Sequence, residues 1–398
     1  MRAYREVLCS NPQPRRAPEY KNMEGQIISC QDHDQVRQTA KLRRASVRSW
    51  MEEQKTDGLL IGRRDHFAWL TCGGNNAVIR DSEWGSAYLL ITPQRRYLLA
   101  HPMDSARMMQ EDLPGQGYQE AVVNRAGSFW RQAQRLAPGR IFSDGCFSGH
   151  CPTVDLSSLH QGLEPVERDR IRWLGHTTAL VFEELAKHLA RGVSEQEIAR
   201  WLHSSLILNG IEPSVIITGS EGRLEQYWHP LASPKQVRQY ALIHAASMRW
   251  GLHACVNRTV CFGPPPPSLR ERHSKSISIQ ETILSLLREG IPYKEIQDRQ
   301  RRRFAALGLR ADWKGHFHGG MTGYCIGDGD RWKTDMTVKR NQAFDWFVTV
   351  GGVQTEELVL LTGQGLEIPS LGIGWPKTTI AVNGQPAQFP GLYILPHT

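Results

Sequence analysis

HAASMRWGLHACVNRTVCFG, residues 244–263, predicts two apolar strands joined by a turn at Arg249-Trp250-Gly251. His253 and Cys255 are two residues apart, so on a strand they share one face, and His244 can face them from the partner strand. These residues alone leave three interpretations open: a metal site, a nucleophile site, or a core that contains some polar side chains.

An internal repeat surrounds this hairpin. LARGVSEQEI at 189–198 matches LREGIPYKEI at 287–296, with Leu, Gly, Glu and Ile recurring at a constant offset of 98 residues. The same offset carries Gly210-Ile211 onto Gly308-Leu309. Each copy predicts a helix, a glycine stop, a second helix and a second stop, followed by strands. The repeat therefore predicts a duplicated α+β unit whose two pseudo-symmetric halves enclose a cleft.

The segment 41–160 has a different pattern, in which helix-like and strand-like stretches alternate. LLIG, FAWLTC, AYLLIT and RYLLA are short apolar strand candidates, and this alternation is typical of an α/β domain. The periodicity lapses around residues 150–166, which predicts a linker. We therefore expect an N-terminal arm at 1–40, an α/β domain at 41–160 and an α+β domain at 161–398.

Composition restricts the class of protein. No apolar run reaches the roughly 18 residues of a membrane span, and the N-terminal sequence has no apolar core of a secretory signal. The 8 cysteines form no CxxC pair, so we expect free thiols and a cytoplasmic protein. The net charge is +8, and RQRRR at 299–303 is the sharpest basic run. No nucleic-acid motif accompanies that run, so we expect a solvated helix face and no nucleic-acid partner.

Five ordered motifs resemble one known family. They are YWHP, GLHACVNRTVCFG, REGIPYKEI, GHFHGG and GGVQTEELVLLTG, at 227–230, 251–263, 288–296, 315–320 and 351–363. The chain resembles the creatinase/aminopeptidase P family of M24 peptidases, which have the pita-bread fold, over nearly all of residues 40–365. The resemblance implies a creatinase-like N-terminal domain, a pita-bread C-terminal domain and a homodimer in which one subunit caps the other's cleft.

The resemblance also locates the metal-ligand positions. Metal-dependent members bind two divalent ions with two Asp, one His and two Glu. In this sequence the two Asp positions hold His244 and Cys255, the His position holds His316, and the two Glu positions hold Phe347 and Glu356. Three of the five ligands are replaced, so we expect no dinuclear metallopeptidase activity and no cofactor.

The motif around His229 points to a different chemistry. Creatinase, which needs no metal, uses a histidine at this position as general acid and base, and an imidazole exchanges protons near neutral pH. We therefore expect a metal-independent, creatinase-like enzyme that acts on a C–N bond of a small nitrogen-containing substrate, an amino acid, guanidine or amide, with a role in specialised biosynthesis. His229 would move the proton, while His316 and Glu356 would orient the substrate.

Two alternatives remain open. Cys255 is a nucleophile, a soft metal ligand or a small buried residue, and as a ligand it would join His244, His316 and Glu356 around one zinc or iron ion. The chain could instead be an inactive M24-like binding protein. Arg258 anchors the hairpin, pairs with Glu356 or touches substrate. The residues expected to contact substrate are His244, His253, His318, Arg258, Trp228 and Asp345.

Overall fold

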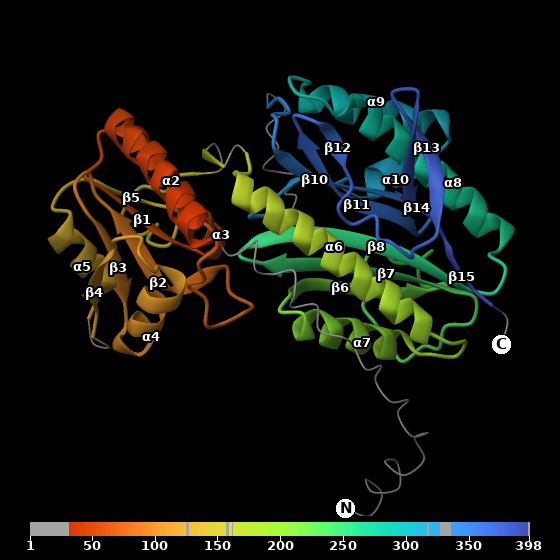
Figure 1. Cartoon of the computed structure of the whole chain (residues 1–398), viewed down its shortest axis with the longest axis horizontal. Helices are drawn as coiled ribbons and strands as arrows, with labels where there is room; N and C mark the ends of the chain where they lie inside the picture. Colours follow the sequence, from red (N-terminus) through yellow and green to blue (C-terminus); the bar gives the residue numbers. More distant parts are fainter. Residues whose placement is uncertain are drawn as a thin grey trace, which may run out of the picture.

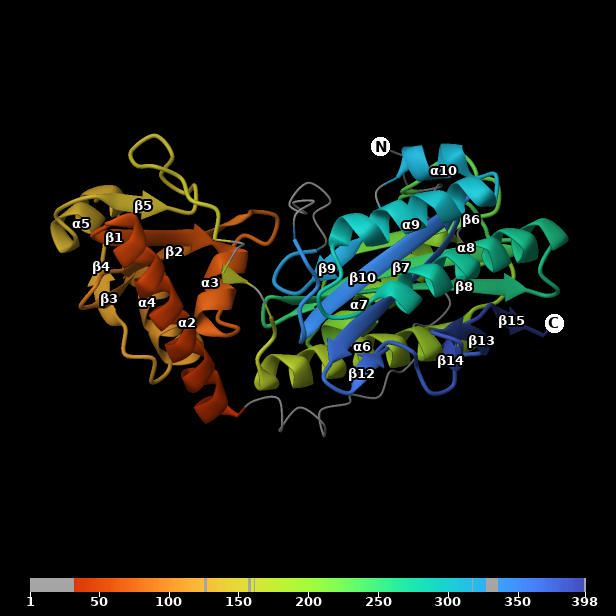
Figure 2. The same ribbon diagram turned by 90° about the horizontal axis from the view of Figure 1, so that it is seen from above.

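The computed structural model describes residues 32–124, 127–156, 159–160, 162–316, 318–326 and 336–396. Two domains lie side by side along the long axis of the molecule (Figures 1 and 2). Within these residues no helix combines the length and apolar character needed to cross a membrane.

The N-terminal domain is an α/β domain, as the sequence predicts. Its sheet has the order β4-β3-β2-β1-β5, in which β1 pairs antiparallel with β2 and parallel with β5. The strands are β1 (Gly58–Arg63), β2 (Trp84–Ile91), β3 (Arg96–Ala100), β4 (Gln119–Val122) and β5 (Ile141–Ser143). The helices are α2 (His33–Gln54), α3 (Arg64–Thr71), α4 (Pro102–Arg107), the π-helix η3 (Met108–Asp112) and α5 (Phe129–Leu136).

One predicted strand is wrong. FAWLTC falls in α3 and its C-cap, not in the sheet. The six residues 66–71 are all buried, so this helix has no polar face from which a helical period could be recognised. A short, fully apolar run does not distinguish a buried strand from a buried helix.

The two domains meet at Glu167 near the start of α6 (Pro165–His188). Its carboxylate binds the guanidinium of Arg43 from α2 and the hydroxyl of Tyr324. The Arg43 guanidinium also lies 5.4 Å from the ring centroid of Trp69. Because Glu167 and Arg43 are buried, this pair fixes the N-terminal domain against the loop that follows β9 (Gly320–Thr322).

The C-terminal domain consists of two halves, each with helices packed on its own strands. One sheet has the order β15-β8-β7-β6 and the other β12-β11-β10-β9, and a β13-β14 hairpin follows. The first half contains α6, α7 (Glu195–Leu208), β6 (Glu212–Ser220), β7 (Tyr240–Arg249) and β8 (Leu252–Phe262). The second contains α8 (Pro267–Leu286), α9 (Tyr293–Ala306), α10 (Arg310–Gly315), β9, β10 (Gln342–Val350), β11 (Val353–Thr362) and β12 (Gly365–Glu367). The remaining strands are β13 (Lys377–Val382), β14 (Gln385–Pro390) and β15 (Tyr393–Leu395).

The predicted duplication is confirmed at the level of single hydrogen bonds. Gly192 N donates to Val237 O at 2.9 Å, and the repeat-related Gly290 N donates to Val338 O at 2.8 Å. The helices α7 and α9 both contain 14 residues. Each is followed by a glycine with positive φ, 68° at Gly210 and 76° at Gly308, a conformation that favours glycine.

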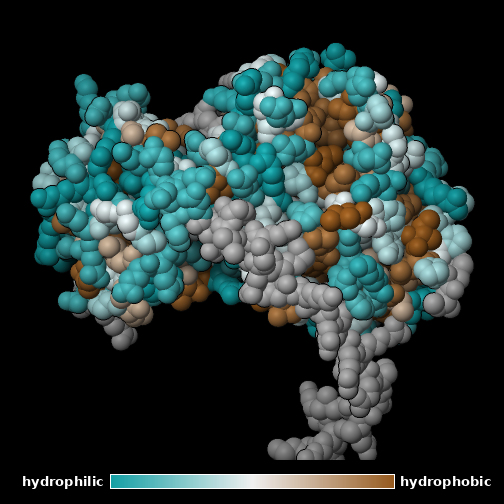
Figure 3. All heavy atoms as spheres, viewed as in Figure 1, coloured by the Kyte–Doolittle hydropathy of each residue, from teal (hydrophilic) through white to brown (hydrophobic). Residues whose placement is uncertain are grey.

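The hydrophobic surface is distributed unevenly between the two domains. On the face drawn in Figure 3 the N-terminal domain is mainly hydrophilic, whereas apolar side chains gather over the second half of the C-terminal domain, between β12 and the β13–β14 hairpin. The partly buried residues that pack on the second-half core include Leu366, Ile368, Val382 and Ala387.

Candidate active site

A cavity of about 350 Å³ lies between the two halves of the C-terminal domain. The first half supplies side chains from β6, β7 and β8, and the second half supplies them from β10 and β11. The polar lining residues are His229, His244, Cys255, His316, Asp345, Gln354 and Glu356. The apolar ones are Val215, Ile217, Leu231, Ala246, Ile326 and Phe347.

Strand register explains why polar side chains from two hairpins meet here. His244 on β7 is opposite Asn257 on β8, and Cys255 lies two residues before Asn257, so His244 and Cys255 share a face. In the second half Phe347 on β10 is opposite Glu356 on β11. All five family ligand positions named from the sequence therefore line one cavity, although only His316 and Glu356 keep the expected residue type.

A thiol and two carboxyl groups form the floor of the cavity. Cys255, Asp345 and Glu356 are buried, and a donor atom of each lies within 4.8 Å of the others. Burial, followed by the charge of Glu356, raises the pKa of Asp345 well above its usual range. Burial and the two neighbouring carboxylates raise the pKa of the Cys255 thiol in the same way. Cys255 therefore lacks the lowered pKa that a thiolate nucleophile needs.

Two histidines form the rim. His229 Nε2 and His316 Nε2 lie 3.0 Å apart, and the two rings meet edge to face with centroids 4.8 Å apart. One imidazole donates this hydrogen bond and the other accepts it, so each ring fixes the tautomer of its partner. Burial, followed by the charge of His244, lowers the pKa of His229. The Trp228 ring lies 5.5 Å from the His316 ring, at the edge of the pair.

His244 connects the floor to the first half. Its Nδ1 lies 3.0 Å from Glu356 Oε2, an ion-pair distance without hydrogen-bond geometry. The exposed fraction of His244 is 9%, so its imidazole is surrounded mainly by protein atoms, including the carboxyl group of Glu356, and has little contact with water. Glu356 thus has His244 as its basic neighbour, and Arg258 does not pair with it.

Arg258 lies outside this cavity and makes an anchoring contact instead. Its guanidinium binds the carboxylate of Glu357 and the carbonyl of Ser370, and it lies 5.3 Å from the ring centroid of Trp375. Glu357 is the strand neighbour of Glu356, and adjacent strand residues point to opposite faces. The expectation that Arg258 contacts substrate or Glu356 is therefore corrected.

Two further histidines lie away from the cavity. His253 Nδ1 lies 3.1 Å from the carbonyl oxygen of Gly323, at the junction with the N-terminal domain. His318 stacks on Trp313 with a centroid separation of 4.2 Å, and its Nε2 lies 2.9 Å from the Trp313 carbonyl. Burial lowers the pKa of each to about 4, which suits neutral, structural imidazoles. Neither His316 nor His318 lies in a strand, and the two rings have different partners, since His316 contacts His229 and His318 stacks on Trp313.

The structure adds lining residues that were not predicted. Gln354 receives a hydrogen bond from Asn257 Nδ2 at 3.2 Å and donates one to the Trp228 carbonyl at 3.1 Å, so it connects both halves of the site. It lies two residues before Glu356, and strand alternation from Glu356 would have placed it on the same face. Val215 and Ile217 are also two residues apart on a strand, within SVIITG, and both line the cavity from the same face of β6.

The donor set does not fit a pair of divalent ions. A dinuclear M24-type centre relies on four carboxylates, whereas this cavity contains two, Asp345 and Glu356. Asp345 holds its proton to a higher pH than an exposed aspartate does. The apolar ring of Phe347 occupies the first Glu position. Too little negative charge remains to hold two adjacent dications.

Comparisons with known proteins agree with this geometry. Residues 169–363 match the model of metallopeptidase family M24. The fold is similar to that of an Xaa-Pro dipeptidase from Bacillus anthracis (TM-score 0.69, 17% identity, covering 89% of this chain and 100% of that one). It is also similar to the dipeptidase PepE of Mycobacterium ulcerans (TM-score 0.71, 14% identity, covering 90% of this chain and 99% of that one).

A further similar structure is the N-terminal domain of a FACT complex subunit from Eremothecium gossypii (TM-score 0.62, 11% identity, covering 84% of this chain and 96% of that one). No curated protein sequence matches the chain. The duplicated halves, the ordered motifs and the matched family model agree, and the C-terminal domain of this chain therefore belongs to metallopeptidase family M24, as a divergent member that lacks most of the metal ligands.

Proposed function

We propose that the chain is a metal-independent, creatinase-like enzyme that acts on a C–N bond of a small nitrogen-containing substrate. The observation that carries this proposal is the hydrogen-bonded pair of His229 and His316 at the rim of a cavity whose floor contains two carboxyl groups. This arrangement places a proton carrier beside an anionic recognition group. It needs no metal to operate.

His229 is suited to act as a base. Its lowered pKa keeps the imidazole neutral near pH 7, with one ring nitrogen able to accept a proton. In the proposed reaction His229 takes a proton from the attacking water and returns it to the leaving nitrogen. His316 holds the ring in place through the 3.0 Å contact between the two Nε2 atoms.

The floor supplies recognition of a cationic nitrogen. Glu356 is buried beside Asp345, whose raised pKa leaves it as a hydrogen-bond donor next to a carboxylate. Asp345 Oδ1 is buried without a hydrogen-bond partner among the residues that the structure describes. An amine or guanidinium N–H would satisfy that oxygen. The volume of about 350 Å³ lies near the lower end of ligand sites, roughly 300–1,000 Å³, so it suits a small molecule.

A binding screen tests the recognition step. Small amines, guanidines and amino-acid amides are added to the purified chain, and the unfolding temperature is measured. A ligand at 100 times its Kd is expected to stabilise the wild type by about 2.7 kcal/mol. Glu356→Gln is expected to lose this effect, while the exposed control Glu289→Gln keeps it. Neutral hydrocarbons that stabilise the protein as well as amines do would contradict a carboxylate-based recognition.

One observation favours a second candidate, an enzyme with one transition metal. Cys255, Asp345 and Glu356 place three donor atoms within 4.8 Å of one another. This set differs from the sequence-based one, because it lacks both His244 and His316 and contains Asp345. His316 is engaged with His229. Thiolate and carboxylate donors suit zinc or iron. One equivalent of zinc per chain, lost in Cys255→Ser, would favour this candidate over the first.

A third candidate is a binding protein without catalysis. It is supported by the likeness to a FACT complex subunit, because a shared fold does not by itself establish an activity. We further propose that the chain forms a homodimer in the cytoplasm and does not bind nucleic acid. Light scattering of the purified chain tests the dimer, and a mass equal to one chain would contradict it.

A further inference from the structure

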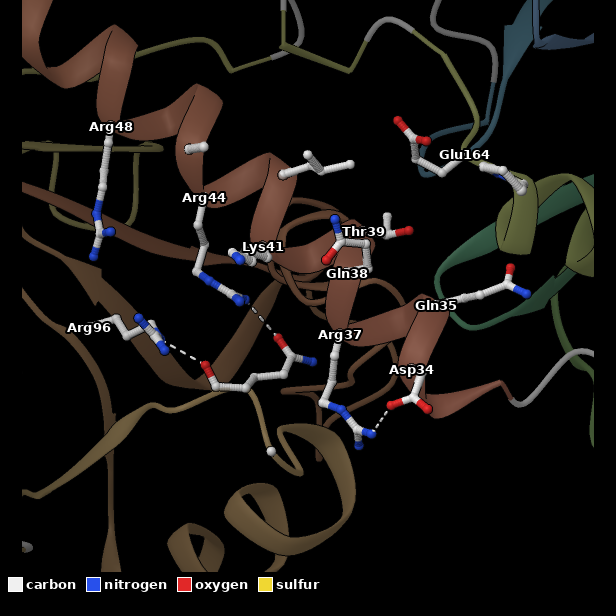
Figure 4. Close-up of a pocket in the computed structure, with 15 residues that line it drawn as sticks. Asp34, Gln35, Arg37, Gln38, Thr39, Lys41, Arg44, Arg48, Arg96 and Glu164 are labelled. Carbon is white, nitrogen blue, oxygen red and sulfur yellow. Dashed lines mark hydrogen bonds and ion pairs between the residues drawn. The ribbon is translucent and has the colours of Figure 1, made fainter.

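A second cavity, of about 1140 Å³, lies beside helix α2 of the N-terminal domain and extends to the start of α6. Three arginines line one end of it: Arg44 and Arg48 descend from α2, and Arg96 comes from the start of β3 (Figure 4). The two acidic lining residues, Asp34 and Glu164, lie at the opposite end. The arginine end is therefore a concentrated positive region in a domain far along the molecule from His229.

The three guanidinium groups have no carboxylate partner among the described residues. Arg44 Nη1 donates to the neutral side-chain oxygen of Gln116 at 3.0 Å, and Arg96 Nε donates to the Gln116 carbonyl at 2.7 Å. Arg48 Nε is buried without a hydrogen-bond partner. The neighbouring Arg43, in contrast, pairs with Glu167.

The acids that line the cavity are already engaged elsewhere. Asp34 pairs with Arg37 one turn along α2 (Figure 4). Glu164 caps α6, where its side chain accepts the backbone N–H of Glu167. Neither carboxylate therefore neutralises the arginine end.

The cluster is held in place rather than free to disperse. Gln116 is 2% exposed, and its Nε2 donates to the Thr71 carbonyl at 2.8 Å, which fixes the oxygens that bind Arg44 and Arg96. A side chain at Gly117, where φ is 69°, would place its Cβ 2.2 Å from Arg96 Nη2. Burial and the charge of Arg44 lower the pKa of Arg96, in accordance with like charges at close range.

We propose that this end of the cavity binds the phosphate group of a small phosphorylated ligand. Two or three guanidinium groups match a dianionic phosphate, and the planar fork of arginine donates paired hydrogen bonds to its oxygens. The bound anion replaces the carboxylate that the cluster lacks. The remaining volume accommodates the organic part of the ligand. This proposal concerns the N-terminal domain and does not depend on the function proposed for the C-terminal cavity.

Calorimetric titration of the full chain with inorganic phosphate, pyrophosphate and acetate tests the proposal. We expect saturable binding of pyrophosphate or phosphate at one site per chain, and at least tenfold weaker binding of acetate. Arg96→Gln is expected to weaken phosphate binding at least tenfold. Arg95→Gln removes an equal charge at the adjacent exposed position and is expected to change the affinity less than twofold.

A stability measurement separates a ligand site from a structural role. Without phosphate, Arg96→Gln is expected to unfold at the same or a higher temperature than the wild type, because it relieves repulsion. A lower unfolding temperature in phosphate-free buffer would contradict the proposal. It would also be overturned by an absence of saturable phosphate or pyrophosphate binding, by equal affinities in Arg95→Gln and Arg96→Gln, or by binding of a single-stranded oligonucleotide alone.

Discussion

His229→Ala is expected to lower kcat by roughly 10²–10⁴-fold on any substrate found by the binding screen, which is the usual contribution of a positioned acid or base. The imidazole contacts His316 at the rim of the cavity, where His229 is exposed and His316 is half-buried. The substrate Kd is expected to stay within about threefold, because Asp345 and Glu356 form the recognition floor. Steady-state kinetics measures kcat, and calorimetry measures the substrate Kd.

The pH profile adds an independent check on His229. Because its pKa is lowered, the neutral base persists to a lower pH than for a free imidazole, whose pKa is about 6.5. We therefore expect kcat/KM to fall on the acidic side only below about pH 6.5. His203→Ala, which removes an exposed imidazole from α7, serves as the control and should leave kcat unchanged. A kcat for His229→Ala within twofold of the wild type would remove His229 from the mechanism and favour a binding protein.

Arg258→Met is expected to lower the free energy of unfolding by roughly 3–5 kcal/mol, because it leaves the buried Glu357 carboxylate without its partner. The side chains of Arg258 and Glu357 are each 1% exposed, so water does not replace the lost contact. The change also removes the hydrogen bond to Ser370 and the contact with Trp375. Urea denaturation followed by circular dichroism measures the loss.

Two control variants show whether the loss of stability in Arg258→Met comes from an unpaired buried charge. Arg258→Met with Glu357→Leu replaces both charges and is expected to be more stable than Arg258→Met alone, because no unpaired charge remains. Arg340→Met breaks the pair between Arg340 and Glu289, whose side chains are 58% and 54% exposed, and should cost less than about 1 kcal/mol. Equal losses in Arg258→Met and Arg340→Met would contradict the anchoring role of Arg258.

Most of the fold could be predicted from the sequence because the duplication leaves local signals in both halves. Ser194 and Glu197 form a capping box at the start of α7. Gly210 and Gly308 adopt the left-handed conformation that ends each helix. These patterns involve only a few neighbouring residues, so they can be recognised in the sequence without knowledge of tertiary contacts. The buried helix α3 was missed because burial on every side removes its periodicity.

The site was predictable only where strand alternation applies. Alternation correctly places His244 and Cys255 on one face of the β7–β8 hairpin. His318, which was expected to contact substrate, is not among the lining residues of the cavity, because it lies outside any strand and its ring stacks on Trp313. The proximity of Asp345 to Cys255 follows from no local pattern, because it crosses from one half of the domain to the other.

The cavity contains two carboxyl groups, Asp345 and Glu356, where a pair of divalent ions relies on four, so we expect it to bind no pair of Mn²⁺ ions. The most direct measurement is elemental analysis of the chain after equilibration with excess Mn²⁺ and removal of free metal, with activity measured before and after chelation. We expect less than one equivalent of manganese per chain and unchanged turnover of the screened substrate. Two equivalents per chain, with chelator-sensitive cleavage of Xaa-Pro peptides, would contradict it.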